Sequence, residues 1–125
     1  MNTKTIEWVL RIAVAGEFIG HGMFAVQAKS SWFGYFEPFG ITDPGTITTI
    51  LMAVGILDLL LGILVLIKPI RPAILWMAVW GLFTAMIRWP IGAEPVWDFL
   101  ERWTNWGAPL ALYLLLGGRF PFKRN

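Results

Sequence analysis

Residues 46–67 form an apolar run whose only charged side chain is Asp58. Residues 5–26 form a second long run, and 57% of the chain is hydrophobic, against roughly 45–50% in a soluble domain. A helix needs about 20 mostly apolar residues to cross the hydrocarbon of a bilayer. We therefore expect a membrane protein that folds as a single domain over residues 1–125.

Prolines divide the rest of the chain. Pro69 and Pro72 close the 46–67 run, and Pro95 opens a short amphipathic stretch. We predict an all-α fold, a transmembrane four-helix bundle with a short interfacial helix before the last span. The predicted spans cover about residues 5–26, 46–67, 72–89 and 103–117.

Basic residues gather on one side of this predicted topology. Four crossings place both termini on the same side as the connection between the second and third spans. That side carries Lys4, Lys68, Arg71, Arg119, Lys123 and Arg124. The other side has Lys29 and Arg102, with Arg88 at its edge. The positive-inside rule therefore predicts a multi-pass protein of a bacterial inner membrane with both termini in the cytoplasm.

The segment between the first two spans, residues 27–45, is rich in Gly, Ser and Pro, which predicts a loop. Aromatic side chains are dense in it: Trp32, Phe33, Tyr35, Phe36 and Phe39. Such a density beside a span, like that of the later tryptophans, favours a belt at the membrane interface. A binding cage is the alternative interpretation.

Three ionisable side chains lie deep inside the predicted spans. Glu17 and His21 are four residues apart, so they share one face of a helix. Asp58 is central in the antiparallel second span, at a similar depth. Such groups cost roughly 2.5–3.5 kcal/mol to insert and usually have a function. Two ionised carboxyls would repel, so we expect one to be protonated or to share charge with His21, and we predict all three as catalytic, proton-handling residues.

Five further residues are predicted to complete a ligand site. They are Arg88, Thr84, Asn105, Trp106 and Phe24. Arg88 lies at the outer end of the third span, from where its stem can reach back as a counter-charge or anion contact.

A purely structural role is the alternative for every one of these residues, as partners that satisfy one another across the bundle. Arg11 has Glu7 one turn before it, which predicts a local ion pair. Two pairs of glycines predict close helix approach. They are Gly16 with Gly20, and Gly55 with Gly62.

The composition excludes several kinds of site. The chain has no cysteine, which removes disulfides, thiolate metal sites and iron–sulfur clusters. His21 is the only histidine. One histidine with two carboxylates offers too few ligands for us to expect a metal or haem site. The net charge is +2, but the basic residues sit at segment ends, so we expect no nucleic-acid partner.

Several stretches, taken in order, resemble the DoxX-like family. They are Arg11, Phe18 and Gly20–His21–Gly22 in the first span, Gly55, Asp58 and Gly62 in the second, and then TAMIRWPIGAEPVWDF and ERWTNWGAPLALYLL. The resemblance implies a small bacterial four-helix membrane protein; some members are associated with oxidoreductase assemblies, including thiosulfate–quinone oxidoreductases. It implies no established catalytic residues. A more distant similarity, to the sterol-isomerase-like superfamily, implies a membrane pocket with carboxylates and a His.

The leading functional prediction is therefore a component of a membrane redox assembly, with a polar intramembrane pocket for a quinone or another lipid-like small molecule. Its partners would be the lipid bilayer, other membrane or oxidoreductase subunits, and a second copy of the chain in a homo-oligomer. The alternatives are an isomerase-like enzyme acting on a lipidic substrate and a non-catalytic scaffold subunit.

Overall fold

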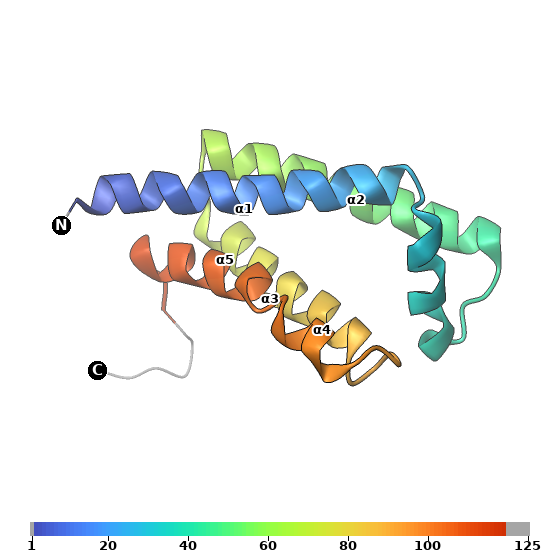
Figure 1. Ribbon diagram of the computed structural model, residues 1–125. Helices are drawn as coiled ribbons and strands as arrows, with labels where there is room; N and C mark the ends of the chain where they lie inside the picture. The colour runs from blue at the N-terminus through green and yellow to red at the C-terminus, as the bar shows by residue number, and fades with distance from the viewer. Residues whose placement is uncertain (1, 120–125) are drawn as a thin grey trace.

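The structure, a computed structural model, describes residues 2–119, whose regular elements are all helices, without a strand (Figure 1). The elements in chain order are α1 (Thr3–Val26), the 3-10 helix η1 (Ser30–Phe39), α2 (Pro44–Ile67), α3 (Arg71–Arg88), α4 (Val96–Leu100) and α5 (Thr104–Leu115). The all-α prediction is confirmed over this part of the chain. Lys123 and Arg124, which were counted among the basic residues of the predicted cytoplasmic side, lie outside the described residues.

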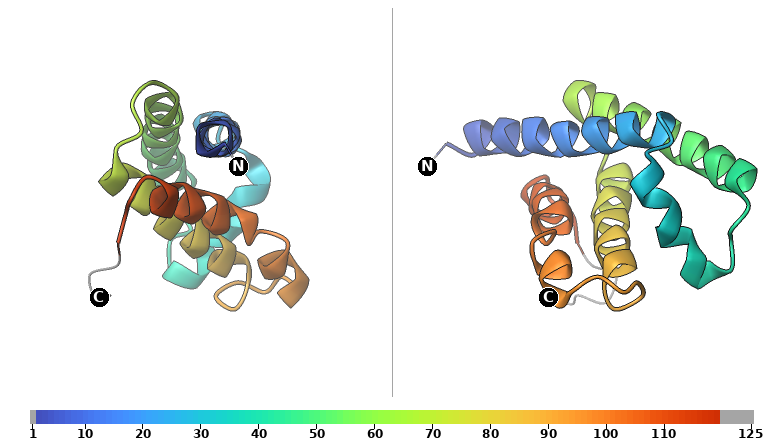
Figure 2. Two further views of the ribbon diagram at one scale, coloured as in Figure 1. Left: turned by 90° about the vertical axis from the view of Figure 1, so that its left-hand side faces the viewer. Right: turned by 45° about the vertical axis from the view of Figure 1, so that its right-hand side comes forward.

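The helices pack in two layers. α1 lies antiparallel on α2, and α3 lies antiparallel on α5 in a second layer below them (Figure 2). Contacts between α1 and α5 join the layers, whereas α2 and α3 touch little. The core between the layers includes Phe18, Ile74, Met77 and Leu112, all 2% exposed or less.

Local sequence explains where the first helices begin. The Asn2 side chain accepts a hydrogen bond from the Lys4 N–H, and the Asp43 carboxylate accepts one of 2.9 Å from the Thr46 N–H. Each side chain satisfies an N–H group that has no partner within its helix. Pro44 follows Asp43 in the first turn of α2, where its missing N–H costs nothing.

Close approach of α1 and α2 depends on glycines. A Cβ on Gly55 would lie 2.8 Å from the Gly22 carbonyl oxygen, and a Cβ on Gly62 would lie 3.2 Å from that of Ala15. The predicted packing role of Gly55 and Gly62 is confirmed. The prediction for Gly16 and Gly20 is wrong, because nothing lies within 4 Å of a Cβ there. These two glycines are on the outer face of α1, and Gly22 makes the contact instead.

The predicted loop at residues 27–45 contains an element that the sequence pattern concealed. Ser30–Phe39 forms a 3-10 helix, ended by Gly40 at φ 75°. Gly34 and Pro38 inside it are turn residues, which favour a loop when the sequence is considered alone. η1 descends from the end of α1 toward α3 and bridges the two layers, with Phe39 against Phe83 at 6.3 Å between ring centroids.

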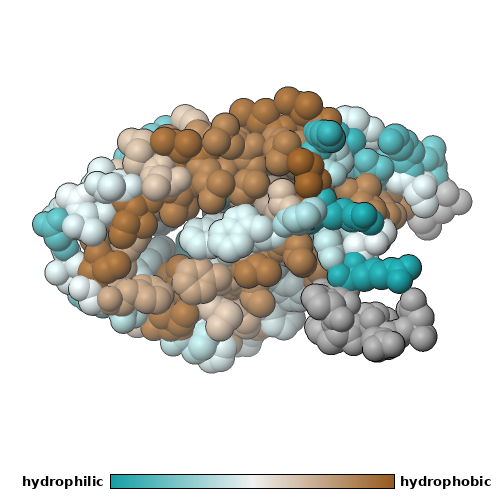
Figure 3. Space-filling model, turned by 180° about the vertical axis from the view of Figure 1, so that it is seen from behind, coloured by the Kyte–Doolittle hydropathy of each residue, from teal (hydrophilic) through white to brown (hydrophobic). Residues whose placement is uncertain are grey.

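Two helices, α1 and α2, are long and apolar enough to cross a membrane. About a third of each apolar window is buried within the structure, and the rest is partly buried or exposed. Figure 3 shows a broad hydrophobic surface, with hydrophilic residues gathered mainly at the right-hand end. Among residues 2–119, the other two long helices, α3 with 18 residues and α5 with 12 residues or about 18 Å, are not candidate spans by length and hydropathy. The four-span topology therefore stays a prediction.

Candidate functional site

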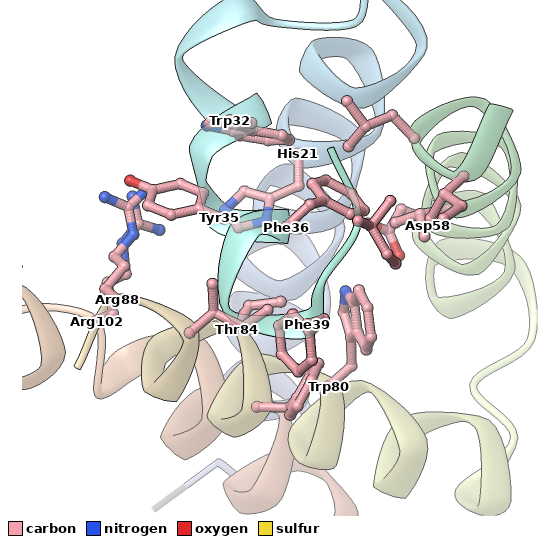
Figure 4. A pocket seen from close by; sticks show the side chains of 16 residues that line it. His21, Trp32, Tyr35, Phe36, Phe39, Asp58, Trp80, Thr84, Arg88 and Arg102 are labelled. Carbon is pink, nitrogen blue, oxygen red and sulfur yellow. The ribbon is translucent and has the colours of Figure 1, made fainter. Parts of the chain in front are cut away.

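A cavity of about 280 Å³ lies where η1, α2 and α3 meet the end of α1 (Figure 4). Aromatic side chains form much of its wall: Trp32, Tyr35, Phe36, Phe39, Trp80 and Phe83. Polar and charged side chains complete it: His21, Asp58, Thr84, Arg88 and Arg102. An apolar pocket with a few convergent polar groups is the usual form of a small-molecule site.

Four of the predicted site residues line this cavity. His21 comes from α1, Asp58 from α2, and Thr84 and Arg88 come from α3. Three helices that are separate in sequence thus contribute to one cavity. The Thr84 hydroxyl donates to the Gly81 carbonyl at 3.1 Å, which leaves its oxygen as an acceptor toward the cavity.

Glu17 lies one turn deeper on α1 than His21, is half-buried, and does not line the cavity. It is nevertheless within electrostatic range of Asp58 and of Arg102. The two carboxyls therefore lie near each other, as their predicted depths require. Glu17 can act on a bound molecule only through another group.

Three predicted ligand residues lie outside the cavity wall. Phe24 is 45% exposed and packs edge-on against Trp32. Asn105 meets α3 with its backbone, since a Cβ on Gly81 would lie 2.1 Å from the Asn105 carbonyl oxygen. Trp106 stacks edge-on with Trp103, and its indole N–H is buried without a hydrogen-bond partner among residues 2–119.

Asp58 is 2% exposed, and it is the deepest charged group of the cavity. The indole nitrogen of Trp80 is directed at its carboxyl group (Figure 4). A buried carboxyl needs such a donor, because an unpaired one loses its hydration without compensation. Trp80 was not predicted as a site residue, since its indole is ordinary on a predicted span.

His21 faces a different environment. Its ring packs edge-on against Trp32, with centroids 5.8 Å apart. The charges that act on it are those of Arg102, Arg88 and Lys29. A neutral imidazole carries one donor and one acceptor nitrogen, so His21 can either give or take a hydrogen bond beside the cavity.

Two arginines line the cavity on the side of Tyr35. The Arg88 guanidinium lies 3.8 Å from the Asp98 carboxylate and 5.0 Å from the Tyr35 ring centroid. The Tyr35 hydroxyl donates to Glu94 at 3.5 Å. Arg102 has a buried Nε without a hydrogen-bond partner in the described part of the chain. Burial, and then the charge of Arg88, lower the pKa of Arg102, yet an arginine stays protonated in proteins.

Sequence reasoning missed the contribution of η1 and of Arg102. Four of the five loop aromatics line the cavity, as the cage interpretation requires. Trp97 is 70% exposed, and the membrane belt stays a prediction. A signal was present in the spacing of Trp32, Tyr35, Phe36 and Phe39, which repeats every three to four residues as one helical face does.

Arg11 belongs to a different, structural site. Its guanidinium pairs with Glu7 at 3.1 Å, as predicted. Its Nε also donates to the Val65 carbonyl at 2.9 Å, and its other terminal nitrogen donates to the Leu66 carbonyl. These carbonyls end α2 and lack helical partners, so Arg11 caps the C-terminus of a neighbouring helix.

No cluster of three His, Cys, Asp or Glu side chains that could hold a metal ion occurs among residues 2–119. The chain matches no known protein family, and neither a curated protein nor a solved structure is significantly similar to it. The resemblance to the DoxX-like family stays a prediction that depends on the order of its short stretches.

Proposed function

We propose that this chain is an integral membrane protein whose two layers form a four-helix bundle in the bilayer, with both termini on the cytoplasmic side. The outward-facing apolar residues of α1 and α2 support this. Ile12 and Leu60 are each 61% exposed, and contiguous apolar surface of this kind needs a partner such as lipid. Arg71 and Lys68 at one end of the bundle agree with the positive-inside rule.

The function that the geometry supports best is binding of a quinone or another lipid-like small molecule in the cavity. One observation carries this proposal: α1, α2 and α3 bring His21, Asp58 and Arg88 to one cavity whose remaining wall is largely aromatic. A planar carbonyl compound would stack on the aromatic rings. Its oxygens would meet the polar groups.

The proposed chemistry is proton handling at the oxygen of the bound molecule. His21 and Asp58 line the cavity and are the groups within reach of a ligand. Glu17 does not line the cavity, and it would exchange a proton with Asp58. In a DoxX-like redox assembly, another subunit would supply the electrons, because no redox-active group is expected in this chain.

The test is to identify what the protein binds. The protein, purified in phosphatidylcholine nanodiscs, is titrated with a decyl-substituted benzoquinone, and tryptophan fluorescence is recorded. Since Trp32 and Trp80 line the cavity, we expect saturable quenching that the substitution His21→Ala weakens. The control Trp97→Phe removes a tryptophan that is 70% exposed, and should leave the affinity unchanged.

Native mass spectrometry of the same sample decides among the alternatives. A co-purified quinone supports the redox function. A sterol-like or isoprenoid lipid that the protein converts to an isomer supports the isomerase-like enzyme, for which Asp58, Glu17 and His21 supply two carboxyls and an imidazole. A protein without bound lipid and without saturable quenching is a scaffold, and the proposal then fails.

A further inference from the structure

The cavity has an uneven distribution of charge. Arg88, at the end of α3, and Arg102, in the turn between α4 and α5, line it on the side where Tyr35 lies (Figure 4). The carboxylates whose charges act on these arginines, Asp98, Glu101 and Glu17, do not line it. The wall near Tyr35 is therefore positive toward the cavity, while the acidic side chain of the lining, Asp58, lies on α2.

The arginines are incompletely paired. Arg88 has one carboxylate partner, at 3.8 Å, a separation beyond that of a strong charge-assisted hydrogen bond. The Nε of Arg102 is buried and has no partner among residues 2–119. The two guanidinium groups also repel each other. A buried donor without an acceptor is costly. An anion between the two groups would therefore accept a hydrogen bond from Arg102 and also offset the repulsion between the two guanidinium groups.

The opposite wall suits a hydrocarbon chain. Phe39 packs on Phe83 there, and Ile50 and Val54 of α2 complete the surface. The volume of about 280 Å³ is slightly below the range of roughly 300–1,000 Å³ for drug-sized ligands. It accommodates a small head group and the first part of a chain.

We propose that the cavity binds an amphiphile with an anionic head, a carboxylate or a phosphate, held between Arg88 and Arg102 with its chain against the aromatic wall. This inference rests on the proposed function, that the cavity takes a lipid-like molecule, and adds the charge of the head group. Arginine pairs such anions in a bidentate geometry.

The test compares three probes on the protein in phosphatidylcholine nanodiscs, by quenching or shift of tryptophan fluorescence. Decyl phosphate and decanol have the same chain and differ in charge, and inorganic phosphate has the charge without the chain. We expect decyl phosphate to bind at least about tenfold more tightly than decanol. Inorganic phosphate should compete weakly, because it gains nothing from the aromatic wall.

Variants locate the effect. Arg102→Gln and Arg88→Gln should each weaken decyl phosphate about tenfold and leave decanol unchanged. Arg102→Lys keeps the charge and should keep most of the preference for decyl phosphate over decanol. A loss of binding in Arg102→Gln that is absent from Arg102→Lys is then due to the charge and not to misfolding. The matched control is Arg71→Gln, because Arg71 lies outside this cavity and bonds to the Leu116 and Gly117 carbonyls; it should bind decyl phosphate as the natural protein does.

The outcomes separate the two proposals. If decanol and the benzoquinone bind as tightly as decyl phosphate, the cavity takes lipid-like molecules without charge selection, and this inference fails while the proposed function stands. If inorganic phosphate binds as tightly as decyl phosphate, the site recognises a free anion, and the amphiphile is excluded. If no chain-bearing probe binds saturably, both proposals fail.

Discussion

The two ends of the bundle use arginine in opposite ways. At the end where the chain begins, Arg11 bonds to two α2 carbonyls and to Glu7, and Arg71 bonds to two carbonyls at the end of α5. At the other end, Arg88 and Arg102 border a cavity, and a buried nitrogen of Arg102 has no partner in the described chain. Paired arginines hold helices together, whereas underpaired arginines beside a cavity are available to a ligand.

The largest expected effect distinguishes the ends directly. Arg11→Met should lower the free energy of unfolding by roughly 3–5 kcal/mol, because it leaves the Val65 and Leu66 carbonyls without their donor and, among residues 2–119, leaves Glu7 with only the exposed Lys4, at 3.7 Å. Arg88→Gln should cost less than about 1 kcal/mol, since its ion pair is long, at 3.8 Å, and its partner Asp98 is still partly exposed. Denaturant unfolding in detergent measures both. Equal losses would show that the two ends do not differ.

The second effect tests the helix contact between the ends. Gly55→Ala should destabilise by about 2 kcal/mol, because the added Cβ would lie 2.8 Å from backbone atoms of Gly22 and Val26. Gly16→Ala is the control on the open face of α1 and should stabilise by roughly 0.5–1 kcal/mol. The same unfolding measurement applies, and a loss at Gly16 as large as that at Gly55 would place an unseen partner on that face.

A third, smaller effect concerns the cavity itself. Trp80→Phe removes the indole N–H directed at Asp58 and should cost about 1–2 kcal/mol. Trp76→Phe is the matched control, because Trp76 stacks on Trp80 and is 42% exposed. It should change the free energy of unfolding by less than about 0.5 kcal/mol. If both variants lose the same amount, ring packing rather than the Asp58 contact is responsible.

The smallest effect depends on pH. Hydrogen bonds from the Thr46 hydroxyl and N–H lower the pKa of Asp43 at the start of α2. A lowered pKa means that this carboxylate stabilises the fold above its unfolded value of about 3.9, and that the stabilisation is lost as the pH falls through the folded pKa. The difference in Tm between the natural protein and Asp43→Asn should be constant near neutral pH and shrink in acid. A difference that grows in acid would contradict this assignment.

Much of the fold was predictable because apolar runs, and the prolines and glycines that end them, are local signals in the sequence. The observed α2, Pro44–Ile67, lies within two residues of the predicted span 46–67, and Pro69 and Pro72 explain why the chain must turn there. η1 was not predictable in this way. Its Gly34 and Pro38 indicate a turn, and its aromatic side chains gain their support from α2 and α3, which are distant in sequence.

The residues of the candidate site also fall into those that the sequence indicates and those that only the structure shows. The sequence alone identified His21, Asp58 and Arg88, because an ionisable residue in an apolar run is conspicuous wherever the helix is placed. Only the tertiary structure decided that Arg102 and Trp80 join them at one cavity and that Asn105 and Phe24 lie outside it. Helical spacing determines which residues share a face, but packing at Gly22–Gly55 and at Gly81 determines which faces meet.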